Sequence, residues 1–252
     1  MSAELSLSFV LLPHQRMPSQ EDFQRAWHEL TQGAAPPTAT AWDAEFVSLE
    51  GDGVSTVVGL MPAPVPKNEA ENAASCSVLS LSNGGYRPAP HVAHLTVASR
   101  SSSQTLAGRL LRHTRLVAAL AKASRAIAVY EGSARATHPA EFYFEVAGGE
   151  GLPAMLWTGL SVVRTESAVD FLTLGLERLQ LPDILLSSPK GGANEALLFL
   201  FQLVEYVVER GSKIAASETV GRSATEKYVV AYVPSPHDPA KRVMRVDMAR
   251  KG

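Results

Sequence analysis

Cysteine is almost absent from this sequence. The 252 residues include a single cysteine, Cys76, which excludes a disulfide within the chain and is typical of proteins from a reducing compartment. Cys76 lies in a stretch of small residues with no basic neighbour to favour its thiolate. We therefore expect a buried structural thiol and not a nucleophile.

Long apolar runs and a strong excess of one charge are also missing. No run approaches the roughly 20 apolar residues that span a bilayer. The first residues lack the basic start and small-residue cleavage site of a signal peptide, so 5–12 is interpreted as a first strand. The net charge is −2 and the pI is near 6.4. These values argue against nucleic acid or an anionic membrane as a partner, and we expect a cytoplasmic protein.

The common catalytic and nucleotide-binding motifs are absent as well. The sequence contains no GxxxxGK[ST], no GxGxxG after a strand, no HExxH, no CxxC and no GxSxG. SPKGGANE at 188–195 resembles a phosphate loop but lacks its lysine-hydroxyl element. A helix-entry turn is the expected role, with anion binding at the following helix as the alternative. The sequence therefore predicts no catalytic residues, no metal and no cofactor.

What is present is the composition of a folded protein. Apolar residues make up 46% of the chain and charged residues 19%, which is typical of a globular protein and not of a disordered one. A chain of 252 residues can form one large domain or two small ones.

Hydrophobic periodicity predicts an alternation of strands and helices. Strands are expected at 5–12, 44–50, 54–61, 91–98, 126–131, 156–164, 170–179, 228–233 and 243–248, with 181–186 open between strand and short helix. Helices are expected between Ser19 and Gly33 and at 67–81, 103–122, 138–147 and 193–210, with Ser103 and Thr137 as caps. The order β-α-β-β-α-β occurs before and after the helix at 103–122.

This order favours an α+β fold of two tandem ferredoxin-like (βαββαβ) units with largely antiparallel sheet. The units are expected at 1–100 and 125–252, joined by a central helix at 101–124, with one continuous globular domain as the alternative. A short similarity between LSFVLLPHQRMPSQEDF and AIAVYEGSARATHPAEF is consistent with a duplication.

Histidines near the middle of the chain form the best candidate constellation for a site. His94, Glu131, His138 and Glu141 fall at the ends of predicted elements, where imidazole and carboxylate groups could hold a metal or run acid-base chemistry. His91 and His94 point to opposite faces of a strand, so they cannot share a metal without a bulge. The alternative is structural: a half-buried His94, a surface cap at His138, and Glu141 placed at a helix start.

Aromatic and arginine side chains give two further candidates. Tyr130 and Trp157 could form a binding platform, although core packing is the alternative for Trp157. Arg222 follows a glycine in a predicted polar loop. It is expected to be either a structural fork on a carboxylate or carbonyl, or a clamp for an anionic ligand.

Three blocks of sequence resemble a bacterial family catalogued only as a domain of unknown function. They are PHVAHLTV at 90–97, AIAVYEGSARATHPAEF at 126–142 and TVGRSATEKYVVAYVPSPHDPAKRVMRV at 219–246. The stretch at 181–186 departs from the pattern by being more apolar. The resemblance implies a cytoplasmic bacterial protein with no assigned catalytic residues and favours an interaction role beside toxin or secretion genes.

Three functional hypotheses follow. The first is a non-enzymatic protein-binding module of immunity or adaptor type, whose partner is a toxin, effector or secretion component. The second is a small-ligand-binding or hydrolytic protein with a cleft between the two halves, in which His94, Glu131, His138 and Arg222 converge. The third is a homodimeric scaffold.

Overall fold

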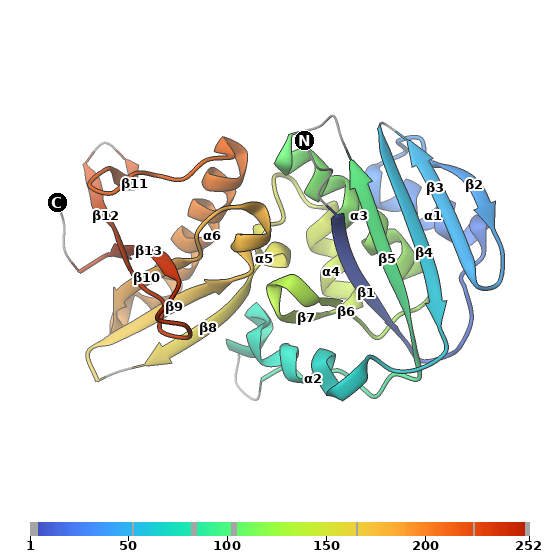
Figure 1. Ribbon diagram of the computed structural model, residues 1–252, viewed down its shortest axis with the longest axis horizontal. Coiled ribbons are helices and arrows are strands. Elements are labelled where there is room, and N and C mark those ends of the chain that lie inside the picture. Colours follow the sequence, from blue (N-terminus) through green and yellow to red (C-terminus); the bar gives the residue numbers. More distant parts are fainter. Residues whose placement is uncertain are drawn as a thin grey trace. The chain divides into compact units, whose positions relative to one another are not determined.

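A computed structural model of the protein describes residues 5–51, 53–81, 85–101, 105–164, 166–223 and 225–249. The chain forms two compact units, Met1–Leu156 and Trp157–Gly252, and each has its own β-sheet (Figure 1). The protein is α+β, and its strand pairs are antiparallel except for one parallel pair in the second unit.

The first unit contains a seven-stranded antiparallel sheet in the order β2-β3-β4-β5-β1-β6-β7. Its strands are β1 (Leu5–Leu12), β2 (Thr38–Trp42), β3 (Phe46–Gly51), β4 (Val54–Met61), β5 (Ala93–Ser101), β6 (Ala128–Glu131) and β7 (Ala136–Pro139). Strand β1 lies inside the sheet, where it pairs with β5 along its whole length and with β6 near its end.

Helices α1 (Gln20–Thr31), α3 (Leu106–Ala123) and α4 (Ala140–Gly148) pack together against this sheet. Helix α1 begins at the N-cap Ser19, whose side chain accepts a hydrogen bond from the Asp22 backbone. It buries Phe23, Trp27 and Leu30 at helical spacing. Thr105 caps α3 in the same way; the expected cap Ser103 lies outside the described residues.

Side chains on β1 alternate between two faces of the sheet, as a pleated strand requires. Ser8, Val10 and Leu12 are fully buried, and Ser8 contacts His113 of α3, so this face is turned to the helices. The opposite face is covered only in part by the segment around α2 (Glu69–Ala73). A small apolar core lies between this face and the α2 segment. It is made of Leu11, Val65, Ala70, Ala73, Ala128 and Tyr130.

The second unit contains a six-stranded sheet in the order β11-β12-β13-β10-β9-β8. Its strands are β8 (Gly159–Arg164), β9 (Ala168–Leu174), β10 (Ile184–Pro189), β11 (Thr219–Ser223), β12 (Glu226–Pro234) and β13 (Arg242–Asp247). Strands β10 and β13 are parallel. Helix α6 (Ala193–Arg210) packs on β10 and β9 through its buried face, and the short helix α5 (Ala154–Trp157) precedes β8.

The strand order does not confirm the tandem ferredoxin-like arrangement. In a ferredoxin-like unit the first strand lies between the third and the last strand. Here the last strand of the expected first unit, β5, lies between β4 and β1. The expected linking helix, α3, packs against α1 and α4 inside the first compact unit, and the division between units falls after Leu156 rather than at 101–124.

Several expected elements have different bounds. The helix expected at 67–81 is reduced to α2 and short 3₁₀ turns. The helix expected from 138 begins at Ala140, because Ala136–Pro139 forms strand β7 on β6. Strand β10 resolves the ambiguity at 181–186, and α6 has the bounds expected for it. The sequence predicted a polar loop where β11 forms, and it predicted no strand at the position of β2.

Gly221 in β11 is required by the close approach of the neighbouring strand. The register shifts between Val220 and Ser223, and a Cβ at Gly221 would lie 1.6 Å from the backbone oxygen of Glu226. Backbone atoms cannot move aside as a flexible side chain can. Any other residue at this position would separate β11 from β12.

We predict that Gly221→Ala lowers the free energy of unfolding by about 1–3 kcal/mol, the usual cost of overpacking. Urea unfolding followed by circular dichroism measures it. The matched control is Gly59→Ala in β4, where the added Cβ meets nothing within 4 Å. Equal stability of the two variants would contradict the assigned role of Gly221.

Candidate functional site

His138 lies on β7 in the interior of the first unit. Its side chain is fully buried, its Nδ1 is 3.0 Å from the Ser77 hydroxyl, and its ring packs near Phe142 and Tyr143. Burial lowers the pKa of His138 to about 4, so the imidazole is neutral near pH 7. The surface cap expected as the alternative for His138 is therefore wrong, because Thr137 and His138 pair with β6.

Glu131 belongs to a buried hydrogen-bond network that joins the sheet to the helices. Its Oε1 accepts hydrogen bonds from the Ser8 hydroxyl at 2.8 Å and from the Tyr143 hydroxyl at 2.7 Å. Ser8 Oγ also lies 2.8 Å from His113 Nε2, and Ser99 Oγ lies 2.8 Å from His113 Nδ1. The five side chains of the network come from five different elements, which are β1, β5, β6, α3 and α4.

The direction of these hydrogen bonds differs from that of a catalytic triad. Since Ser8 donates to Glu131, its oxygen must accept from His113 Nε2. In a triad the histidine accepts the serine proton, and the carboxylate orients the histidine. Here the serine bridges the two other groups, and it is fully buried. We interpret the network as the means by which a buried carboxylate is satisfied.

The sequence interpretation included Glu131 but missed Ser8 and His113. Both carried a weak signal: Ser8 falls in the apolar strand at 5–12, and His113 falls on the apolar side of the helix at 103–122. A polar residue at a core-facing position needs a partner. Nothing in the local sequence identifies that partner.

His94 and Tyr130 lie together on the other face of the sheet. His94 faces Leu11 across the β1–β5 ladder, and Tyr130 faces Phe9 across β1–β6. The Phe9 ring stacks on Tyr130 at 5.6 Å between centroids and meets the edge of His94 at 5.7 Å. His94 is thus separated from Glu131 and His138, which lie on the helix-covered face.

His91 ends the loop before β5 and has structural partners. Its Nε2 accepts a hydrogen bond from the Val65 backbone at 2.8 Å, which leaves the proton on Nδ1, 3.1 Å from Glu71 Oε1. This histidine holds the segment that leads into α2 against β5. It does not share a site with His94.

The structure also shows the surroundings of Glu141, Trp157 and Cys76. Glu141 is exposed in the first turn of α4, where a carboxylate stabilises the helix dipole. Trp157 is 1% exposed and presents no ring surface for a platform with Tyr130. Cys76 is only partly buried, so the fully buried thiol expected from the sequence is not found.

Arg222 lies in the second unit and is held by two carboxylates. Its guanidinium forms a bidentate pair with Glu226, at 2.8 Å from Nε to Oε2 and 2.6 Å from Nη2 to Oε1. Nη2 also donates to Glu195 of α6 at 2.6 Å. Hydrogen bonds from Arg222 and then Tyr228 lower the pKa of Glu226 to about 2. Arg222 thus acts as the expected fork, tying β11 to β12 and to α6.

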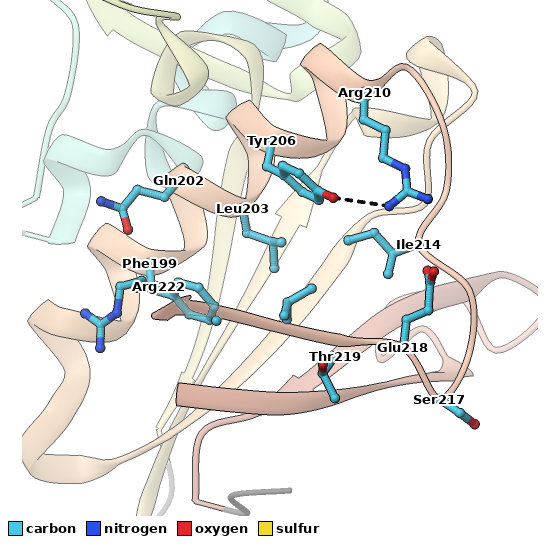
Figure 2. A pocket seen from close by; sticks show the side chains of 12 residues that line it. Phe199, Gln202, Leu203, Tyr206, Arg210, Ile214, Ser217, Glu218, Thr219 and Arg222 are labelled. Carbon is cyan, nitrogen blue, oxygen red and sulfur yellow. Dashed lines mark hydrogen bonds between the residues drawn. The ribbon is translucent and has the colours of Figure 1, made fainter. Parts of the chain in front are cut away.

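A groove of about 890 Å³ runs between α6 and β11 in the second unit (Figure 2). Its helix side is formed by Phe199, Gln202, Leu203, Tyr206 and Arg210, and its other side by Ile214 and Ser217–Arg222. Tyr206 is 48% exposed, and its hydroxyl accepts a hydrogen bond from Arg210 at 3.2 Å. The groove therefore combines an apolar floor with a polar rim.

The structure describes residues 5–51, 53–81, 85–101, 105–164, 166–223 and 225–249. Within these ranges, no group of three or more His, Cys, Asp or Glu side chains is placed to hold a metal ion. The helices in these ranges are too short or too polar to cross a membrane.

Comparison with known proteins shows that part of the second unit is similar to an uncharacterised family. Residues 172–247 match the family model described as Domain of unknown function (DUF4261). The match covers β10, α6, β11, β12 and β13, which include the groove and Arg222. No curated protein and no solved structure matches the chain.

The Glu131 network generates a prediction about stability. Tyr143→Phe keeps the ring but removes one donor to the buried carboxylate, and we expect the free energy of unfolding to fall by about 1–3 kcal/mol. Urea unfolding at pH 7 measures it. The control is Tyr206→Phe at the surface, which should change stability by less than about 0.5 kcal/mol. A neutral Tyr143→Phe would contradict the importance of this bond.

His138 generates a prediction about pH. Its folded pKa of about 4 lies below the unfolded value of 6.5, so the unfolded chain binds more protons between these values. Stability should therefore fall as pH falls from about 6.5 to 4, with a loss of about 3 kcal/mol from this residue alone. His138→Phe should lose less stability than wild type over this range.

Denaturant unfolding at pH 7 and pH 4 tests the prediction. The control is Leu116→Val, a change in a buried side chain of α3 that alters packing and no proton-binding group. It should lower stability equally at both pH values. An identical pH dependence in His138→Phe and wild type would contradict the assigned role of His138.

Proposed function

We propose that the protein is a non-enzymatic protein-binding module, and that the groove between α6 and β11 receives an extended segment of the partner. The observation that carries the proposal is the groove itself, because it lies within the segment matched to the family and has an apolar floor. Clefts that combine apolar surface with polar groups are typical binding sites.

The edge position of β11 supports an extended occupant. Strand β11 is the last strand of its sheet and is mostly exposed, so backbone groups on its free side can pair with another chain. The irregularity after Val220 limits the regular ladder to a short stretch. Recognition would therefore depend mainly on partner side chains that enter the groove, with strand pairing as a smaller contribution.

Exposed apolar side chains on α6 support the same proposal. Leu198 is 67% exposed and Tyr206 is 48% exposed, and tyrosine is enriched at positions that dominate interface energies. Arg222 is held by Glu195 and Glu226, so its position in the wall of the groove is defined before any partner binds. A preformed wall lowers the entropic cost of binding.

The nature of the partner and the assembly of the protein remain predictions. A toxin, effector or secretion component is what the resemblance to the bacterial family implies, and a homodimer is the third hypothesis. A cytoplasmic location is likewise expected from the sequence. The second hypothesis, a ligand cleft between the two halves, required His94, Glu131, His138 and Arg222 to converge. Within the first unit, His94 lies on the opposite face of the sheet from Glu131 and His138.

We predict that a partner recovered from the organism that makes this protein binds through the groove. Tagged wild-type protein should retain it. Tyr206→Glu should weaken the complex at least tenfold, or about 1.4 kcal/mol, because it removes an aromatic side chain from the groove and puts a charge in its place. The control Val163→Glu changes a side chain on β8 that is 49% exposed and should leave binding unchanged.

The measurement is affinity capture with quantitative mass spectrometry, followed by calorimetry with the purified partner. A partner lost equally in Tyr206→Glu and Val163→Glu, or retained equally in both, would contradict the groove as the site. Recovery of no partner in repeated captures would overturn the proposed function.

A further inference from the structure

A second cavity lies in the first unit, on the face of the sheet turned away from α3. It has a volume of about 410 Å³ and is lined by Leu7, Phe9, Val65, Pro66, Glu69, His94, Tyr130, Gly132 and Ser133. This volume is within the range of small-molecule sites, roughly 300–1,000 Å³. The walls are mainly apolar, and polar groups are few.

His94 supplies a hydrogen-bond acceptor to this cavity. The residue is 6% exposed, and its Nδ1 lies 2.9 Å from the Ala63 carbonyl oxygen, so Nδ1 must carry the proton and donate it. No residue in the described part of the chain hydrogen-bonds Nε2. Burial lowers the pKa of His94, which keeps the imidazole neutral and Nε2 unprotonated.

Aromatic rings form the wall beside His94. Phe9 stacks on Tyr130 with an angle of 22° between the rings. Burial, and then the nearby Glu69 carboxylate, raise the pKa of Tyr130, while Arg135 opposes them. The phenol therefore stays protonated, and Glu69 lies close enough to influence it. Among the described residues that line the cavity, Glu69 is the one acidic side chain, and none is a lysine or arginine.

We propose that this cavity binds a small aromatic amine. The ring of the ligand packs against Phe9 and Tyr130, where aromatic contacts are favourable. An N–H group donates to His94 Nε2, and the positive charge lies beside the Glu69 carboxylate. Both acceptors select for a donor, and an aromatic carboxylate would place two negative groups together. The site belongs to the first unit and is independent of the groove in the second.

The test uses 2-phenylethylamine as the probe and 3-phenylpropionate as its matched anion. Binding is followed by NMR through the imidazole protons of His94 and by calorimetry on the full chain. The amine should shift the His94 signals in a saturable way and bind at least tenfold more tightly than the acid. Glu69 is exposed, so Glu69→Gln should fold normally and weaken amine binding at least threefold.

His94→Phe tests the acceptor, because it keeps an aromatic ring and removes Nε2. It should weaken amine binding at least tenfold, with circular dichroism to check the fold. The control is Glu45→Gln, an exposed carboxylate outside the cavity, which should bind as wild type does. The proposal is overturned if the amine does not bind, if the acid binds as tightly, or if Glu69→Gln and Glu45→Gln bind alike. None of these outcomes bears on the groove.

Discussion

A buried carboxylate constrains how the strands and helices of the first unit meet. Glu131 is 3% exposed and accepts hydrogen bonds from Ser8 on β1 and Tyr143 on α4, while His113 of α3 reaches it through Ser8. Each buried polar group left without its partner would cost about 1–3 kcal/mol. The strands and helices therefore have to meet in one arrangement, because any other would leave a charge unpaired.

Strands β1 and β6, which supply Ser8 and Glu131, also form part of the cavity on the other face of the sheet, because side chains along a strand alternate between its two faces. Ser8 and Glu131 face the helices, while the adjacent Phe9 and Tyr130 face the cavity that His94 lines. A shift of one residue in the β1–β6 register would exchange the two sets. The network on one face therefore fixes the position of the aromatic wall on the other. A buried structural network and a candidate ligand site are thus coupled by strand geometry.

The second unit achieves a comparable rigidity near its surface. Gly221 allows β11 to approach β12, and this approach places Arg222 between Glu226 of β12 and Glu195 of α6. Exposed ion pairs add little stability on their own, but a bidentate arginine has a defined geometry. The result is a fixed wall along the groove, in the part of the chain matched to the uncharacterised family.

The sequence by itself determined most of the longer, periodic elements, but it did not predict β2, β7 or β11. Apolar periodicity located β1, β4, β5, α3 and α6. The glycine-arginine pair left Arg222 open between a structural fork and an anion clamp, and the structure shows it held by two carboxylates. Only the tertiary structure decided the strand order and which polar groups meet. Thr137 and His138 resembled a helix start until pairing with β6 made them a strand. Ser8 meets His113 across 105 residues and Glu131 across 123. Hydrogen bonds over such separations leave no periodic signal, because they depend on how whole elements pack and not on neighbouring residues.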